Sequence, residues 1–290
     1  MSYAYKLRRT APWLWLAPAI AIFIPFFIIP IAVVVRNSFN VDDPLALMVS
    51  DFTLINYRNV ITDPYYYRVI FNSLWVSAAI TLGTLLIGYP FAYFLVRRAK
   101  RSLIFLLWAI YTPLVVSIIV RAFGWIVITA DSGLINAALL SVGLVHEPVK
   151  ILFEVEGMMV AMVHRYLPLM VIPLVNALSR IDTQLYSASL NLGASDRRTF
   201  WKITVPLSLP GFVAGTQLVF AVVLSDFVIP SLLGSTRFRM LAPVVYDEAM
   251  IRVAWANAAA LASVMLLIVV TMLVTSTLTY RRLAPWARGL

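Results

Sequence analysis

Ionisable side chains are rare inside the long apolar runs of this 290-residue sequence, and an ionisable group inside a membrane usually faces a cavity or a partner. Asp226 occurs in "VLSDFVIP" and Arg165 in "HRYLP". Beside a path through a membrane, Asp226 would attract a cation. Both groups would equally suit ion pairs that only stabilise the fold, so two interpretations are open. An arginine that lined such a path would argue against a purely cationic ligand.

Two further residues are candidates for contact with a ligand in the same apolar runs. The ring of Trp125 can stack on a cation, although anchoring at the membrane interface is a commoner role. Asn72 is polar within an apolar run, where hydrogen bonding between helices is the usual role. We therefore take Asp226, Arg165, Trp125 and Asn72 as the candidates for a translocation path.

Catalytic patterns are missing from the sequence. It has no cysteine and only two histidines, so a thiolate or metal site is not expected. No lysine ends a Gly-x-x-x-x-Gly-Lys-Ser/Thr loop, which is the usual cradle for nucleotide phosphates. No serine stands in a nucleophile elbow. The sequence predicts a protein that is not an enzyme by itself and binds no cofactor of its own.

The elements that must position these residues are membrane-spanning helices. The chain is 62% hydrophobic and 12% charged, and its mean hydropathy is +0.90. A span needs about 20 apolar residues in a helix, and the runs are continuous rather than alternating. We predict an all-α, polytopic membrane protein with one domain over 1–290. The six predicted spans are 13–35, 70–96, 103–128, 157–178, 207–232 and 255–279.

The basic residues predict the orientation of the spans. With the N-terminus inside, the inner segments hold fourteen of the 23 lysines and arginines, and "RRAKR" at 97–101 is the densest group. Cytoplasmic loops carry such an excess, so both termini are predicted to be cytoplasmic. The net charge of +10 is explained in the same way, and no nucleic-acid partner is expected.

The segment 182–206 lies on the predicted inner side and is unusually polar for this chain. Asp182 or Thr183 can cap the start of a helix, Gly193 suits a helix end in the left-handed conformation, and Ser195 can cap a second helix. The segment is therefore predicted to form a helix, a glycine turn and a second helix. It is either an amphipathic connector on lipid headgroups or a docking element for a soluble partner.

The stretch "YSASLNLGASDRRTFWKITVPLSLPG" resembles the cytoplasmic signature loop of ABC-importer permeases. That pattern is Glu-Ala-Ala, a glycine a few residues later, and a final Pro-x-x-x-Pro, here Pro206 and Pro210. Ser187 replaces the glutamate and Ser189 the second alanine. "FTLINYRNVI", "FNSLWVSAAITLGTLLIGYPFAYFL" and "SDFVIPSLLG" extend the resemblance to polyamine-type permeases, over about residues 12–280.

The resemblance implies a type I importer permease bundle in the bacterial inner membrane, surrounded by lipid. Its expected partners are a second, homologous permease, a soluble substrate-binding protein and two ATP-binding subunits that hold ATP and Mg²⁺. The implied substrate is a polyamine, with an opine, a phosphonate, ferric iron or thiamine as alternatives. An ion-gradient-driven transporter is the other class considered, but it usually has more spans or inverted repeats. The implied ATPase-coupling residues are Leu185, Tyr186, Ser187, Ala188, Leu190, Gly193 and Ala194.

Overall fold

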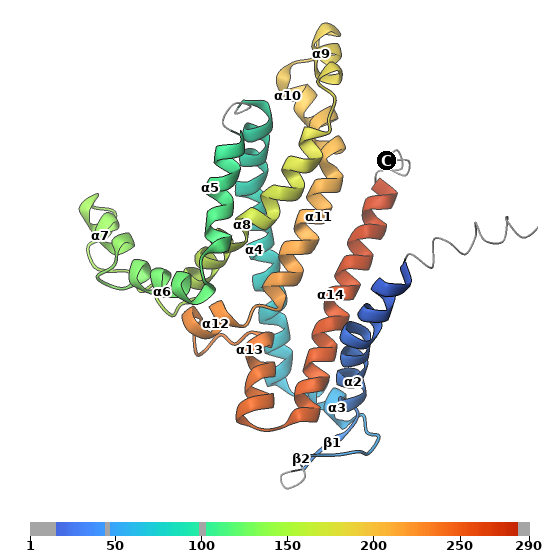
Figure 1. Ribbon diagram of the computed structural model, residues 1–290. Coiled ribbons are helices and arrows are strands. Elements are labelled where there is room, and N and C mark those ends of the chain that lie inside the picture. Colours follow the sequence, from blue (N-terminus) through green and yellow to red (C-terminus); the bar gives the residue numbers. More distant parts are fainter. Residues whose placement is uncertain (1–15, 44–46, 99–102, 284–290) are drawn as a thin grey trace, which may run out of the picture. The chain divides into compact units, whose positions relative to one another are not determined.

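The computed structural model describes residues 16–43, 47–98 and 103–283 of the chain (Figure 1). Its contacts divide these residues into two compact units. The smaller comprises the described part of 1–63 together with 245–264, and the larger comprises the described parts of 64–244 and 265–290. That the chain works as one permease domain stays a prediction.

The prediction of six apolar helices is confirmed. Six helices of the described residues are long and apolar enough to cross a membrane. Large apolar side chains remain exposed on them, as expected of surfaces that face lipid. The six are Leu16–Asn37 (containing η1, Ile24–Ile28, and α2, Ile29–Asn37), α4 (Pro64–Arg97), Ile118–Ser141, α8 (Val155–Ser179), Asp196–Leu224 and α14 (Trp255–Leu283).

The predicted continuous span 103–128 is wrong. The structure divides it into α5 (Leu103–Val115) and α6 (Ile118–Thr129), and α7 (Leu134–Ser141) follows. Ser117 has φ of −49° and ψ of 135°, which is not a helical conformation and interrupts the helix. The guanidinium of Arg121 donates to the carbonyl of Val116 at 2.8 Å and so satisfies an acceptor that the break exposes. Arg121 therefore has a hydrogen-bond partner at the helix break.

The predicted span 207–232 also ends early. Helix α11 (Val205–Leu224) stops before Ser225, whose hydroxyl donates to the carbonyls of Ala221 and Val222. A new short helix, α12 (Val228–Leu233), then begins. Asp226 consequently lies in the break between two helices and not within a continuous span.

Helices α4, α8 and α11 form the core of the larger unit and lie side by side in Figure 1. Their facing side chains include Ile80, Met170 and Val219, which are completely buried. A Cβ on Gly211 would lie 2.4 Å from the carbonyl oxygen of Pro173, so α11 approaches α8 this closely only because position 211 is glycine.

The smaller unit contains a short β-hairpin that the sequence did not predict. Strand β1 (Val41–Asp43) pairs antiparallel with β2 (Leu47–Val49), and α3 (Ile55–Thr62) supplies the short helix expected in the loop 36–69. The carboxylate of Asp42 accepts the N–H groups of Ala256 and Asn257 at 2.6 and 3.0 Å. It thereby caps the start of α14, which follows α13 (Leu241–Tyr246) and η3 (Asp247–Ile251).

The orientation with both termini inside stays a prediction. Six of the fourteen basic residues that favour it lie at 1–15, 99–102 and 284–290, outside the described residues.

Candidate functional site: a docking turn and a buried ion pair

The segment 182–206 folds as its local signals predict. Helix α9 (Thr183–Asn191) begins with Asp182, whose side chain accepts the N–H of Gln184 at 2.8 Å. Gly193 has φ of +79° and ends the helix, and Ser195 caps α10 (Asp196–Thr199). A short π-helix, η2 (Phe200–Thr204), then leads directly into α11. Helices α9 and α10 lie together at one end of α8 and α11 (Figure 1).

Three contacts fix α9 against its neighbours. The hydroxyls of Ser189 and Thr199 are buried and hydrogen-bonded at 2.8 Å. The Tyr186 hydroxyl donates to the carboxylate of Asp196. The guanidinium of Arg97, at the end of α4, lies 4.6 Å from the centre of the Tyr186 ring. The hydrogen bond to Asp196 raises the pKa of Tyr186 above its usual value, and partial burial adds to the effect.

The opposite face of this turn is exposed and partly apolar. Of the predicted coupling residues, Leu185, Ser187, Ala188, Leu190 and Gly193 are exposed, whereas Tyr186 and Ala194 are half-buried. The sequence prediction missed Leu192, which is 88% exposed, and Trp201, which is 61% exposed. Both are large apolar residues in a polar segment, and that contrast was the available signal. The turn therefore offers a partner a rigid surface with exposed apolar side chains.

A cavity of about 630 Å³ lies directly beside this turn in the larger unit. Its wall includes Leu185 and Asp182 from the start of α9, Asn176 and Arg180 from the end of α8, and Tyr280 from α14. A displacement of α9 would therefore change the shape of this cavity.

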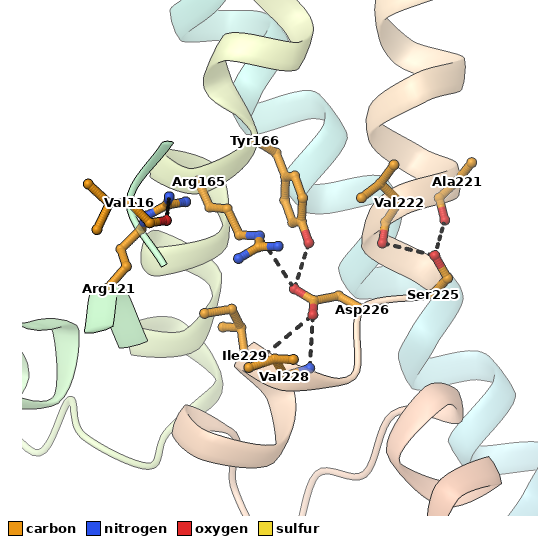
Figure 2. A network of polar contacts seen from close by, with 10 residues as sticks. All are labelled: Val116, Arg121, Arg165, Tyr166, Ala221, Val222, Ser225, Asp226, Val228 and Ile229. Carbon is orange, nitrogen blue, oxygen red and sulfur yellow. Dashed lines mark hydrogen bonds and ion pairs between the residues drawn. The ribbon is translucent and has the colours of Figure 1, made fainter. Parts of the chain in front are cut away.

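The structure brings Asp226, which follows the end of α11, together with Arg165 from the middle of α8 (Figure 2). The Asp226 carboxylate accepts the Tyr166 hydroxyl at 2.6 Å and lies 3.9 Å from Nε of Arg165. Its other oxygen accepts the N–H groups of Val228 and Ile229 at 2.9 and 3.5 Å, which caps α12. Asp226 is thus surrounded by donors from α8 and α12.

Within this pair, the cation and not the carboxylate reaches the surface. The side chain of Asp226 is 4% exposed and that of Arg165 is 20% exposed. Arg121 adds a second positive charge close to Arg165 (Figure 2). Buried charges need partners; the Asp226 carboxylate pairs with Arg165, while Arg121 donates to the carbonyl of Val116. The site therefore suits an anionic group better than a cation.

The other two predicted path residues do not join this network. The ring of Trp125 packs edge-on against His164, with 5.6 Å between ring centres. Asn72 donates to the backbone carbonyl of Arg239 at 3.3 Å and links α4 to the segment before α13. Within the described part of the chain, no three His, Asp or Glu side chains gather as metal ligands would.

Comparison with known proteins adds the family to this geometry. Residues 44–289 match the binding-protein-dependent transport system inner membrane component family. The spermidine/putrescine transport system permease protein PotB of Escherichia coli (strain K12) is 31% identical over 220 residues, which cover 76% of this chain and 80% of that protein. The putative 2-aminoethylphosphonate transport system permease protein PhnU of Salmonella paratyphi A (strain ATCC 9150 / SARB42) is 26% identical over 258 residues, covering 87% and 86%.

A solved structure shares the fold over nearly the whole chain. It is a bacterial ABC transporter involved in the import of the acidic polysaccharide alginate, and it matches with a TM-score of 0.78 at 17% identity. The match covers 97% of this chain and 99% of that one. Because the family match spans most of the sequence, the chain belongs to the inner membrane components of binding-protein-dependent transport systems and is a permease subunit of an ABC importer.

Proposed function

We propose that this chain forms half of the translocation pathway of a polyamine importer. It pairs with a second, homologous permease, two ATP-binding subunits sit below the pair, and a soluble binding protein delivers the substrate. The observation that carries this proposal is the turn formed by α9 and α10, which is held by its own contacts and still presents exposed Leu185, Leu190 and Leu192.

In this proposal α9 docks on an ATP-binding subunit and passes on its movement. The Ser189–Thr199 hydroxyl pair ties α9 to α10, and α10 continues through η2 into α11. A push on α9 is thus transmitted to a core helix as a rigid-body movement. Ser187 stands exposed where the family pattern has glutamate, so docking here depends on shape and apolar contact and not on an acidic residue.

The partner subunits supply the energy of transport. No lysine of this sequence stands in a phosphate-binding loop, so ATP and Mg²⁺ are bound by the ATP-binding subunits alone. This arrangement requires α9 and both termini on the cytoplasmic side, as the excess of basic residues favours.

The relatives named for spermidine and putrescine support a polyamine as the substrate. Asp226 is not the group that binds it, because its oxygens already accept hydrogen bonds from Tyr166, Val228 and Ile229. A zwitterionic aminophosphonate is the second candidate. The exposed edge of Arg165 favours it, as does the similarity to PhnU.

One experiment tests the class and separates the two substrates. The whole complex, assembled in lipid nanodiscs with the neighbouring gene products, is assayed for ATP hydrolysis with binding protein and each ligand. The panel contains putrescine, spermidine, 2-aminoethylphosphonate, an opine, thiamine and ferric iron. Stimulation by a polyamine supports the proposal. Stimulation by 2-aminoethylphosphonate alone would replace the substrate and keep the class. Failure to recruit any ATP-binding subunit would overturn the proposed coupling role of α9.

A further inference from the structure

A basic cavity lies at the end of α4 opposite to the docking turn. Its volume is about 320 Å³, and Arg68, Arg237, Arg239, Asn72, Tyr65 and Thr236 line it. Three arginines thus line one small space, and one of them, Arg239, already has a partner within the chain. None of the described residues that line the cavity is acidic. Arg68 and Arg237 are both exposed, so their charges face the surroundings of the chain.

The length of α4 places this cavity at the far surface of the membrane. Arg97, which contacts α9, follows Arg68 by 29 residues in one helix. At 1.5 Å per residue this separation is about 43 Å, close to the roughly 40–45 Å that a bilayer measures with its headgroups. If α9 meets the ATP-binding subunits, the arginines stand at the outer edge of the membrane.

The sign of the charge excludes one function for this cavity. A cluster of guanidinium groups repels a polyamine, and therefore it is not the entry site for the proposed substrate. Guanidinium groups bind carboxylates well, through paired hydrogen bonds in a fixed geometry. The family description requires a soluble protein to meet the permease, and an outer surface with this charge fits a partner that presents acidic side chains.

We propose that this cavity receives carboxylate side chains of the soluble binding protein, with Arg68 and Arg237 as the principal contacts. The inference rests on the proposed function, because it assumes that α9 is cytoplasmic and that a binding protein docks on the other side. Complementary charge at the rim of an interface acts mainly on the association rate and its salt dependence. Docking should accordingly be fast at low salt and slow down as salt screens the arginines.

The test measures docking directly. The complete complex in nanodiscs of neutral lipid is immobilised, and association of the binding protein is recorded at 50 and 200 mM NaCl. R68E/R237E should slow association at 50 mM NaCl by about tenfold or more and remove most of its salt dependence, in line with charge steering. R58E is the matched control, because Arg58 is an exposed arginine of α3 that does not line the cavity. It should change the rate less than about twofold.

Assembly of each variant is checked by size-exclusion chromatography, and R68Q/R237Q serves if the glutamate variant does not assemble. Equal association for the cavity variant and the wild type would overturn the inference. An equal loss of association rate in R58E would also overturn it, because it would indicate attraction to positive charge anywhere on the surface. Unchanged docking together with a response to anionic lipid would assign the arginines to headgroups instead. If the binding protein neither associates with the wild-type complex nor stimulates its ATP hydrolysis, the proposed function is overturned together with this assignment.

Discussion

The turn formed by α9 and α10 lies between the end of α8 and the start of α11, whereas the buried ion pair joins the middle of α8 to Asp226, beyond the other end of α11. The polar residues of the two sites make different contacts. In the turn, Asp182 and Ser195 cap helices through neighbours two or three residues away. In the ion pair, Asp226 meets Tyr166, which is 60 residues distant in the sequence. The turn depends mainly on contacts within residues 182–206. Asp226 also caps α12 locally, but it adds a contact with the separate helix α8.

The two sites also differ in which side chains a partner or ligand can contact. Around the turn, apolar side chains such as Leu192 remain exposed, so a partner can bind without breaking a contact within the chain. At the ion pair the carboxylate is enclosed by donors, and a ligand would have to displace one of them. Exposure, and not the presence of a charge, therefore separates a surface for binding from a contact that holds the fold.

Replacing the enclosed carboxylate should have the largest effect. Asp226→Asn removes the carboxylate that pairs with Arg165, and breaking a buried pair costs about 3–5 kcal/mol. We expect the thermal midpoint of the complex and transport to fall together. Asp196→Asn is the control, because this exposed carboxylate at the turn contacts Tyr186 and should contribute under about 1 kcal/mol. An Asp226→Asn variant that unfolds like the wild type but fails to transport would make Asp226 a substrate contact after all.

Gly193→Val should have the next largest effect. With its control it distinguishes backbone strain from a role in coupling to ATP hydrolysis. Gly193 and Gly143 have φ of +79° and +70°, and no atom lies within 4 Å of a Cβ placed on either. Their N–H groups donate in the same way to the carbonyls of Leu190 and Leu140. A β-branched residue in this conformation costs about 1–2 kcal/mol. Gly193→Val and Gly143→Val should therefore destabilise the complex equally. Only Gly193→Val should lower the stimulation of ATP hydrolysis by binding protein, and equal losses of stimulation would show that Gly193 has no special role in coupling.

The contrast explains what the sequence could predict. Caps and left-handed glycines depend on a few adjacent residues, and so Asp182, Gly193 and Ser195 could be assigned correctly from their types. The six apolar helices follow from composition in the same way. The helix breaks at Ser117 and Asp226 lie within apolar runs, and hydropathy does not register them. Both positions do hold residues that favour helix caps, which was the signal available.

The pairing of Arg165 with Asp226 could not be predicted, because it depends on how α8 packs against α11. The sequence indicated that Arg165 and Asp226 each needed a partner, but it did not indicate that they pair with each other. The close approach at Gly211 is equally a product of packing. Residue types thus predicted the need for contacts, and only the assembled helices determined which contacts formed.

A smaller effect is expected from the hydroxyl pair that holds α9 to α10. Ser189→Ala leaves the buried hydroxyl of Thr199 without this partner and should cost about 1 kcal/mol. Ser189→Ala/Thr199→Val removes both hydroxyls and should recover part of the loss. Ser187→Ala is the exposed control and should leave the thermal midpoint unchanged. If the double variant is less stable than the single one, the pair does not act as a unit.

The smallest effect should come from Tyr186, whose pKa is raised because its hydroxyl donates to Asp196. A folded-state pKa above the unfolded value means that this contact stabilises the fold below the unfolded pKa, near 10. The stabilisation is lost as the pH rises through the folded pKa. The difference in thermal midpoint between wild type and Tyr186→Phe should therefore shrink from pH 8 to pH 11, while the ring still lies under Arg97.

Absorbance titration of the two proteins isolates Tyr186, and Asp196→Asn should return the pKa of Tyr186 towards the usual value. An unchanged titration in Asp196→Asn would mean that the hydrogen bond does not set the pKa, and that this contact of the turn is weaker than its geometry indicates.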